Sequence, residues 1–142
     1  GPIPTSQLRV ELQRTMQAYA PVYRNSKDML IGVEKVGGVM KKFKDVGVKD
    51  KALIWNTDLI ETFELENLLS QGYEVTVGAE NRKESRGAQA HEDHPERDDE
   101  NWMKHTLSWL NGDKTPTMDY RPVHMYTMTN EATVIPPKAR VY

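Results

Sequence analysis

The sequence predicts an α+β fold, in which a three-helix bundle is followed by a small antiparallel β unit and an extended C-terminal tail. Up to residue 79, apolar residues recur at steps of three and four, which is typical of amphipathic helices. From residue 103 onward, apolar and polar residues alternate, which is typical of strands. We therefore expect a helical part (6–87), an acidic loop (88–101) and a β hairpin with its tail (102–142). Residues 1–5 are interpreted as a linker or a tag remnant.

The 142 residues suit a single domain, and the composition excludes several classes of function. A net charge of -2 gives no overall field that would attract nucleic acid. Cysteine is absent, which excludes disulfides, iron–sulfur ligation and cysteine nucleophiles. No apolar run approaches the ~20 residues of a membrane span, and no targeting peptide is visible. Because only 37% of the residues are hydrophobic, we expect an apolar face that needs a partner.

The first helix is predicted to begin with Thr5 or Ser6 as its cap. Pro21 should kink or end it, because proline cannot donate a hydrogen bond to the preceding turn. Its apolar positions are Leu8, Leu12, Met16 and Tyr19.

The second helix should start at Asn25 or Ser26 and stop near Gly47. Gly37 and Gly38 interrupt its apolar stripe and cost about 1 kcal/mol each relative to alanine. Close packing against another backbone would explain these glycines, and so would a break in the helix. The stripe consists of Met29, Val33, Val36, Met40 and Phe43.

The third helix should start near Asn56 or Thr57, with Asp58 and Glu61 in its first turn, where they complement the helix dipole. Its apolar residues cover a wide arc, which predicts a helix sandwiched between neighbours. These residues are Leu59, Ile60, Phe63, Leu65, Leu68 and Leu69. We expect this helix to end near Gly87.

Beyond the helices, the acidic segment 91–100 with its central proline is predicted to be a solvated loop. A half-buried strand follows over 103–109, with Asn111-Gly112 as a turn and a second strand over 117–123. The apolar faces are Met103, His105, Leu107 and Trp109 on the first strand, and Met118 and Tyr120 on the second. The tail should be extended, and held in place only if it docks.

Three groups of side chains were candidates for chemistry, and in each the structural interpretation is favoured. A metal could bind the histidines and Asp93, but an acidic loop lacks fixed geometry. Acid–base work needs one desolvated carboxyl and one ionised carboxylate, and the local sequence indicates no such split. The lysines lack aromatic neighbours for base stacking. The candidates are His91, Asp93, His94, His105 and His124; Glu61, Glu64, Glu66, Asp98, Asp99 and Glu100; and Lys41, Lys42, Lys44, Lys49 and Lys51. We predict no catalytic residue and no metal ligand.

Eight blocks of the sequence resemble the C-terminal domain of the flavoprotein subunit of succinate dehydrogenase and fumarate reductase. They include the segment Glu84-Ser85-Arg86-Gly87-Ala88 and the final residues Pro136-Pro137-Lys138-Ala139-Arg140-Val141-Tyr142. The other blocks include Trp55-Asn56-Thr57-Asp58-Leu59 and Lys104-His105-Thr106-Leu107-Ser108. The resemblance spans nearly the whole chain. The form of the final seven residues is most similar to that of mitochondrial and related bacterial succinate dehydrogenases.

The resemblance implies a parent enzyme that oxidises succinate to fumarate with FAD, in the citric acid cycle and the respiratory chain. The flavin and the substrate-binding residues would lie in preceding parts of the subunit. This chain would then be non-catalytic and bind no cofactor alone. It would pack on the flavin-binding domain and reach the iron–sulfur subunit and assembly factors through the whole subunit. The expected location is the matrix side of the mitochondrial inner membrane, or the cytoplasmic face of the bacterial inner membrane.

Four residues are candidates for the flavin side of the domain. By the resemblance, Arg86 and Arg140 match arginines linked to covalent flavin attachment, although from the residues alone a surface ion pair is the commoner role of an arginine. Gln89 and His91 depart from a histidine and an arginine of the family pattern. Glutamine can hydrogen-bond there but cannot hold a proton. An alternative function is a free-standing interaction module that binds an assembly or flavinylation partner.

Overall fold

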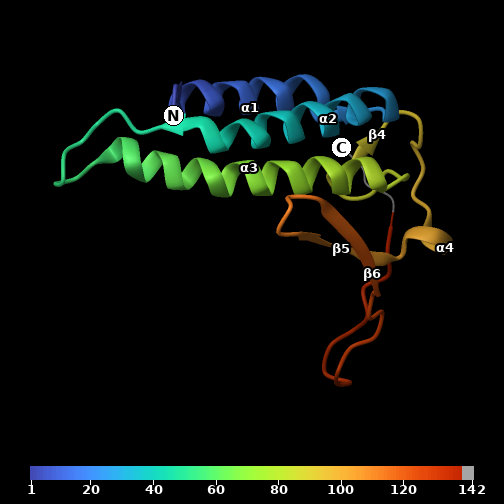
Figure 1. The fold of residues 1–142 in the computed structure, drawn as a ribbon. Helices are drawn as coiled ribbons and strands as arrows, with labels where there is room; N and C mark the ends of the chain where they lie inside the picture. The colour runs from blue at the N-terminus through green and yellow to red at the C-terminus, as the bar shows by residue number, and fades with distance from the viewer. Residues whose placement is uncertain (139–142) are drawn as a thin grey trace.

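The computed structural model describes residues 1–138, and its centre is a bundle of three helices in which each helix runs antiparallel to the one before it (Figure 1). The helices are α1 (Thr5–Tyr19), α2 (Ser26–Lys42) and α3 (Thr57–Asn81). A hairpin of β5 (Lys104–Leu110) and β6 (Pro116–Pro122) lies along α3. The predicted α+β class, with helices before the β unit, is confirmed.

Several short elements fasten the ends of the bundle. Near each end of the bundle, a pair of two-residue strands forms a parallel ladder that joins segments far apart in the sequence. One pair is β1 (Ile3–Pro4) with β3 (Val46–Gly47), and the other is β2 (Tyr23–Arg24) with β4 (Ala90–His91). A 3-10 helix, η1 (Phe43–Asp45), follows α2, and a single turn, α4 (Asp99–Trp102), precedes the hairpin. Residues 3–5, expected to belong to a linker, are thus paired or helical.

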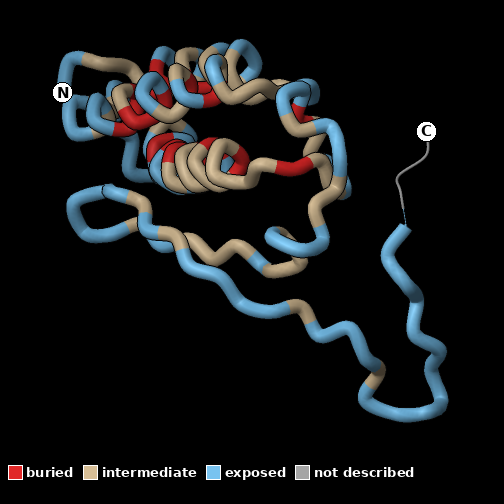
Figure 2. The backbone as a smooth tube through the Cα atoms, turned by 90° about the vertical axis from the view of Figure 1, so that its right-hand side faces the viewer, coloured by how far each residue is buried: buried red, intermediate tan, exposed pale blue. Residues whose placement is uncertain are grey.

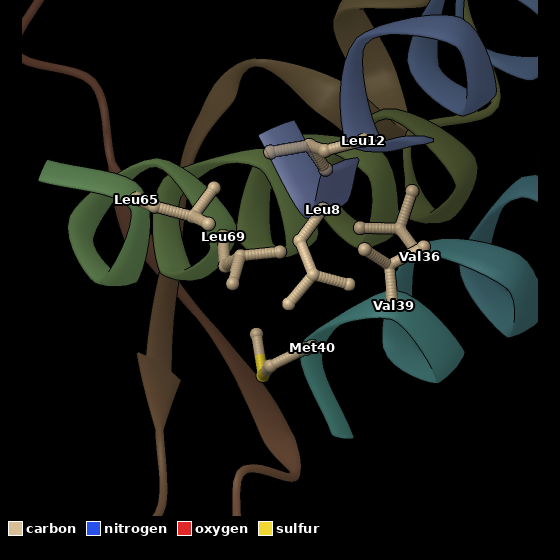
Figure 3. Packing of buried hydrophobic residues seen from close by; sticks show 7 residues of the cluster. All are labelled: Leu8, Leu12, Val36, Val39, Met40, Leu65 and Leu69. Carbon is tan, nitrogen blue, oxygen red and sulfur yellow. The ribbon is translucent and has the colours of Figure 1, made fainter. Parts of the chain in front are cut away.

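The hydrophobic core lies where the three helices meet (Figures 2 and 3). Its buried members are Leu8, Leu12, Val36, Val39, Met40, Leu65 and Leu69. Burying one such side chain contributes roughly 1.5–3 kcal/mol. The apolar spacing read from the sequence therefore identified much of the inward faces of α1 and α2, whereas on α3 only Leu65 and Leu69 of the six predicted residues are buried.

The two glycines in the middle of α2 leave the helix unbroken. Gly37 is buried against Tyr73, whose ring would come within 3.2 Å of an added Cβ. Earlier in the same helix, a Cβ added at Gly32 would lie 2.8 Å from the Cβ of Tyr19 on α1. Of the two explanations that the sequence left open, close packing holds for Gly37, against a side chain rather than a backbone.

The predicted starts of α2 and α3 are confirmed, whereas the cap predicted for α1 is wrong. Asn25 accepts a hydrogen bond from the N–H of Asp28, and Asn56 accepts one from the N–H of Leu59. Thr5, in contrast, is the first residue of α1, and its side chain makes no cap. Its buried hydroxyl bonds to Thr62 on α3 at 2.6 Å instead, which ties the starts of the two helices together.

Helix α3 is shorter and less enclosed than predicted. It ends at Asn81 rather than near Gly87, because Arg82 adopts an extended conformation. The helix packs on α1 and α2, and the hairpin lies against another side of it, so the predicted sandwiching holds where the hairpin lies. It fails near the start of the helix, where Leu59, Ile60 and Phe63 are exposed. The expected exposed apolar face is confirmed. We use the term apolar end for Leu53, Ile54, Trp55, Ile60 and Phe63, which are all exposed around the start of α3.

The predicted inner and outer faces of β5 are only partly right. His105 and Trp109 are exposed, contrary to the prediction, whereas Met103 and Leu107 are half-buried, as are the polar residues Lys104, Thr106 and Ser108. The register places Met118 and Tyr120 opposite Ser108 and Thr106, so the two lie on one face as expected. Leu110 packs against the core, and Arg82 donates hydrogen bonds to Lys104 and Thr106, so β5 is held by both apolar and polar contacts.

Two further observations concern the hairpin loop and the tail. The loop spans residues 111–115, and its left-handed residue is Lys114, with a φ of 64°, rather than Gly112. After β6 the tail makes a long exposed excursion without strand or helix, as Figure 2 shows. In residues 1–138, no helix is both long and apolar enough to cross a membrane.

Candidate functional site

The candidate site is a network of charged residues just beyond the end of α3, built around the carboxylate of Glu84. This side chain is 0% exposed. Its Oε1 accepts hydrogen bonds from Arg82 Nη1 at 2.6 Å and from Arg86 Nε at 2.8 Å. Its Oε2 accepts one from the backbone N–H of Asp98 at 2.9 Å. Burial alone would raise the pKa of Glu84, but the bonds from Arg86, Asp98 and Arg82 together lower it. The carboxylate is therefore ionised inside the domain.

The local backbone explains why these three side chains meet. Because α3 stops at Asn81 and the chain then bends at Glu84, the side chains of Arg82 and Arg86 can both reach the Glu84 carboxylate. The alternation of charge at these positions is the signal by which the sequence could have revealed the network. Sequence reasoning singled out Arg86 and missed the other two.

Arg86 is held from two sides by carboxylates. Its Nη2 donates to Asp99 Oδ1 at 2.5 Å, in addition to the bond from Nε to Glu84. Hydrogen bonding to Glu84 raises the pKa of Arg86, in spite of partial burial. Its Nη1 contacts the sulfur of Met103 at 3.8 Å, a weak acceptor. The guanidinium is thus a fixed cation that two carboxylates hold through Nε and Nη2, and its Nη1 faces a thioether.

Arg82 connects the network to the hairpin. Its Nη2 donates to the carbonyl of Lys104 at 2.6 Å and to the hydroxyl of Thr106 at 3.0 Å. Its Nη1 also donates to the carbonyl of Trp102, and its guanidinium lies 5.2 Å from the centre of that ring. One residue therefore contacts Glu84, α4 and the first strand of the hairpin.

Gln89 closes the end of α3 from inside the domain. Its amide nitrogen donates to the carbonyls of Ala79 and Arg82, at 2.9 and 3.0 Å. Its amide oxygen accepts from Arg24 Nη1 at 2.7 Å. All three bonds lie within the chain, and the two that the amide nitrogen donates satisfy carbonyls at the end of the helix that would otherwise lack partners. The predicted flavin-side role of Gln89 stays a prediction.

His91 is buried, with 1% of its surface exposed, so the prediction of a solvated loop over 91–100 is wrong at this residue. It pairs with Arg24 in the β2–β4 ladder, and Ser85 Oγ accepts its backbone N–H at 2.8 Å. Its Nε2 lies 3.5 Å from Ser26 Oγ, and its Nδ1 is buried without a hydrogen-bond partner. Burial, and secondarily the charge of His94, lowers the pKa of His91. The side chain is neutral near pH 7.

Three further candidates for chemistry, Asp98, Asp93 and Glu64, have local structural roles. Asp98 caps α4 by accepting from the N–H of Asn101, and Asp93 accepts from the N–H of Ser26 at the start of α2. Glu64 pairs with Arg9 at 3.2 Å. Within the described part of the chain, no group of three or more His, Asp or Glu side chains could hold a metal ion.

Arg86 also lines two shallow concavities on the surface, and the tail returns to both of them. Pro137 contributes to each, and Lys138 to the one that contains Arg97. After its exposed excursion, the tail therefore returns to lie beside Arg86. Arg140 lies outside the described residues.

Solved structures of two reductases contain a domain with the same fold as this chain. FrdA of E. coli quinol fumarate reductase superposes with a TM-score of 0.85 at 32% identity, covering 94% of this chain and 23% of that one. Adenylylsulfate reductase from Archaeoglobus fulgidus shares the fold at 22% identity, with a TM-score of 0.75 over 86% of this chain and 20% of that one.

The chain belongs to the family of the C-terminal domain of succinate dehydrogenase and fumarate reductase flavoproteins. The family model described as fumarate reductase flavoprotein C-term matches residues 9–142. The succinate dehydrogenase flavoprotein subunit of Rickettsia conorii is 46% identical over all of this chain and 24% of that protein. The mitochondrial subunit of Oryza sativa subsp. japonica is 48% identical over all of this chain and 22% of that protein. The chain thus spans about a quarter of the length of these relatives.

Proposed function

We propose that this chain is the supporting domain of a succinate dehydrogenase flavoprotein. In the whole subunit, succinate is oxidised to fumarate by FAD, which is bound by other parts of the subunit. The chain itself is non-catalytic and binds no cofactor alone. Identities of 46% and 48% to succinate dehydrogenase subunits, across the whole chain, support this reaction class.

The observation that carries the proposal is the contrast between a packed bundle and its uncovered apolar end. Leu53 is 100% exposed and Trp55 is 84% exposed. Large side chains of this kind on one surface are typical of a protein interface. We assign the flavin-binding domain of the same subunit as the partner that covers this surface.

Arg86 is the candidate for the flavin-side role. Its charge is fixed by Glu84 and Asp99, and the residue lines a concavity on the surface. A fixed cation can stabilise negative charge that develops on an electron-rich ring. We assign Arg86, with Arg140 as its partner, to supporting flavin attachment. The whole subunit would engage an iron–sulfur subunit and assembly factors, at the matrix or cytoplasmic face of the membrane.

The test is complementation between this chain and a separately produced flavin-domain fragment of the same subunit. The chain alone should retain no FAD and turn over no succinate, whereas the mixture should form a complex that does both. A matched pair of variants, Phe63→Ser and the exposed-loop variant Tyr126→Ser, separates the apolar end from general surface effects. Failure of the mixture to associate would overturn the proposal and favour the alternative, an interaction module for an assembly partner.

A further inference from the structure

We propose that Glu84 is the positioning residue of Arg86, and that Arg82 makes this positioning depend on the docked hairpin. The inference deepens the proposed function and rests on it only for its consequence at the flavin. Its physical content, the orientation of one guanidinium, concerns this chain alone.

The first step is the difference between the two carboxylates that hold Arg86. Glu84 is 0% exposed and accepts the Nε–H, whereas Asp99 is 42% exposed and accepts from Nη2. Water competes for the exposed pair, so its contribution is small. A buried charge-assisted bond is stronger, and leaving either partner unpaired there is costly. Glu84 therefore determines where the plane of the guanidinium lies.

The second step is that Glu84 Oε1 is shared. The same oxygen accepts from Arg82 Nη1 and from Arg86 Nε, so the three side chains form one unit. Arg82 in turn donates to Lys104 and Thr106 on β5. If the hairpin left α3, Arg82 would lose these acceptors, and its guanidinium would be free to draw Glu84 away from Arg86.

The third step concerns which part of Arg86 stays available. Glu84 occupies Nε and Asp99 occupies Nη2, which leaves the Nη1 edge towards Met103 and the concavity that Pro137 also lines. The tail follows β6, which is paired with β5, the strand that Arg82 contacts. The docked hairpin therefore bears both on Arg82, and through it on Arg86, and on where the tail begins.

The experiment is NMR of the whole 142-residue chain, observing exchange of the Arg86 Nε–H with water. In the unmodified chain this proton should be protected. Glu84→Gln should speed its exchange by about tenfold or more, the equivalent of one charge-assisted hydrogen bond. Asp99→Asn, the matched control on the same arginine, should leave it within about twofold. Thr106→Val, which removes one acceptor of Arg82 on the hairpin, should speed it to an intermediate degree.

Glu84→Asp covers the case in which Glu84→Gln does not fold, because it keeps the charge and withdraws the carboxylate by one methylene. It too should expose the Nε–H. Unchanged protection in folded Glu84→Gln or Glu84→Asp chains would overturn the positioning role. An unchanged signal in Thr106→Val would overturn the coupling to the hairpin.

The consequence at the flavin is read separately, in the whole subunit. Arg86→Lys tests the proposed function, and Glu84→Asp tests the inference. If Arg86→Lys leaves covalent flavin attachment intact, the proposed role of Arg86 fails while the NMR result still stands. If Arg86→Lys lowers attachment and Glu84→Asp does not, the inference fails.

Discussion

The two ends of helix α3, roughly 35 Å apart for a helix of this length, carry opposite kinds of side chain in opposite environments. At the C-terminal end, charged side chains are buried and satisfied by one another, as with Glu84 between Arg82 and Arg86. At the N-terminal end, large apolar side chains project into solvent, as with Trp55 and Phe63. At the C-terminal end the charges are balanced within the chain, whereas the apolar side chains at the N-terminal end have no cover among the described residues.

The apolar end is exposed but not loosely held. Asp58 accepts hydrogen bonds from the N–H groups of Lys49 and Asp50, and Asn56 donates to the carbonyls of Asp50 and Ala52. Trp55 has a φ of 51°, a left-handed conformation that costs roughly 1–2 kcal/mol for a residue with a side chain. The comparison teaches that exposure here reflects a prearranged surface, since a hydrogen-bonded loop presents it.

The largest effect should come from breaking the buried network. Glu84→Ala is expected to lower the free energy of unfolding by about 3–5 kcal/mol, because two arginines lose a buried partner. Asp99→Ala, on the exposed side of the same arginine, should cost no more than about 1 kcal/mol. Urea denaturation of both variants measures the difference. Equal losses would contradict the contrast between the buried and the exposed carboxylate.

Two adjacent leucines in α3 test the sides of the helix. Leu69 is 1% exposed in the core, whereas Leu68 is 44% exposed on the other side. Leu69→Ala should cost about 2–5 kcal/mol through the cavity that it leaves. Leu68→Ala should cost less than about 1 kcal/mol in the chain alone. Thermal denaturation of the pair would refute the assigned orientation of α3 if the order were reversed.

A third prediction concerns pH at the polar end. The pKa of His91 is lowered in the folded chain from its ordinary value of 6.5, so the unfolded chain binds the proton first. Its contribution to stability is therefore complete above about pH 6.5 and is lost as the pH falls below that value. The slope cannot exceed about 1.4 kcal/mol per pH unit for one proton. Chemical denaturation between pH 7.5 and 5 should show a reduced slope in His91→Gln, and an unchanged slope would exclude His91 as the source.

The smallest effect on the chain itself should come from the apolar end. Phe63→Ser is expected to change the free energy of unfolding by no more than about 0.5 kcal/mol, because the ring is largely in water. The same change should weaken association with the flavin-domain fragment severalfold or more. Isothermal titration against that fragment measures it. Full retention of affinity would place the interface elsewhere on the domain.

Local signals predicted much of the fold. The apolar periods gave the helices, and the capping preference of asparagine gave the starts of α2 and α3. The end of α3 was misjudged because Arg82 leaves the helix to bond with Lys104 and Thr106, which lie far along the chain. No window of local sequence contains that competition.

The site was predicted in part for the same reason. Arg86 was identified through the resemblance and by its charge, but its partner Glu84 acquires significance only when burial removes water from the pair. His91 was expected in a solvated loop because its neighbours are acidic, yet Asp93 and Glu92 face outward while the imidazole packs inward. Composition reports the average of a segment, and burial is decided residue by residue.

The short β2–β4 ladder has a consequence for the order of assembly. The ladder joins Tyr23 and Arg24 to Ala90 and His91, so it closes a long loop that contains α2 and α3. Only two residue pairs make up this ladder. Because the entropy of closing a loop must be offset before the contact stabilises anything, this rung should form last during folding and open first on the way to unfolding. The imidazole at this rung would therefore report, in real time, whether the domain has finished folding.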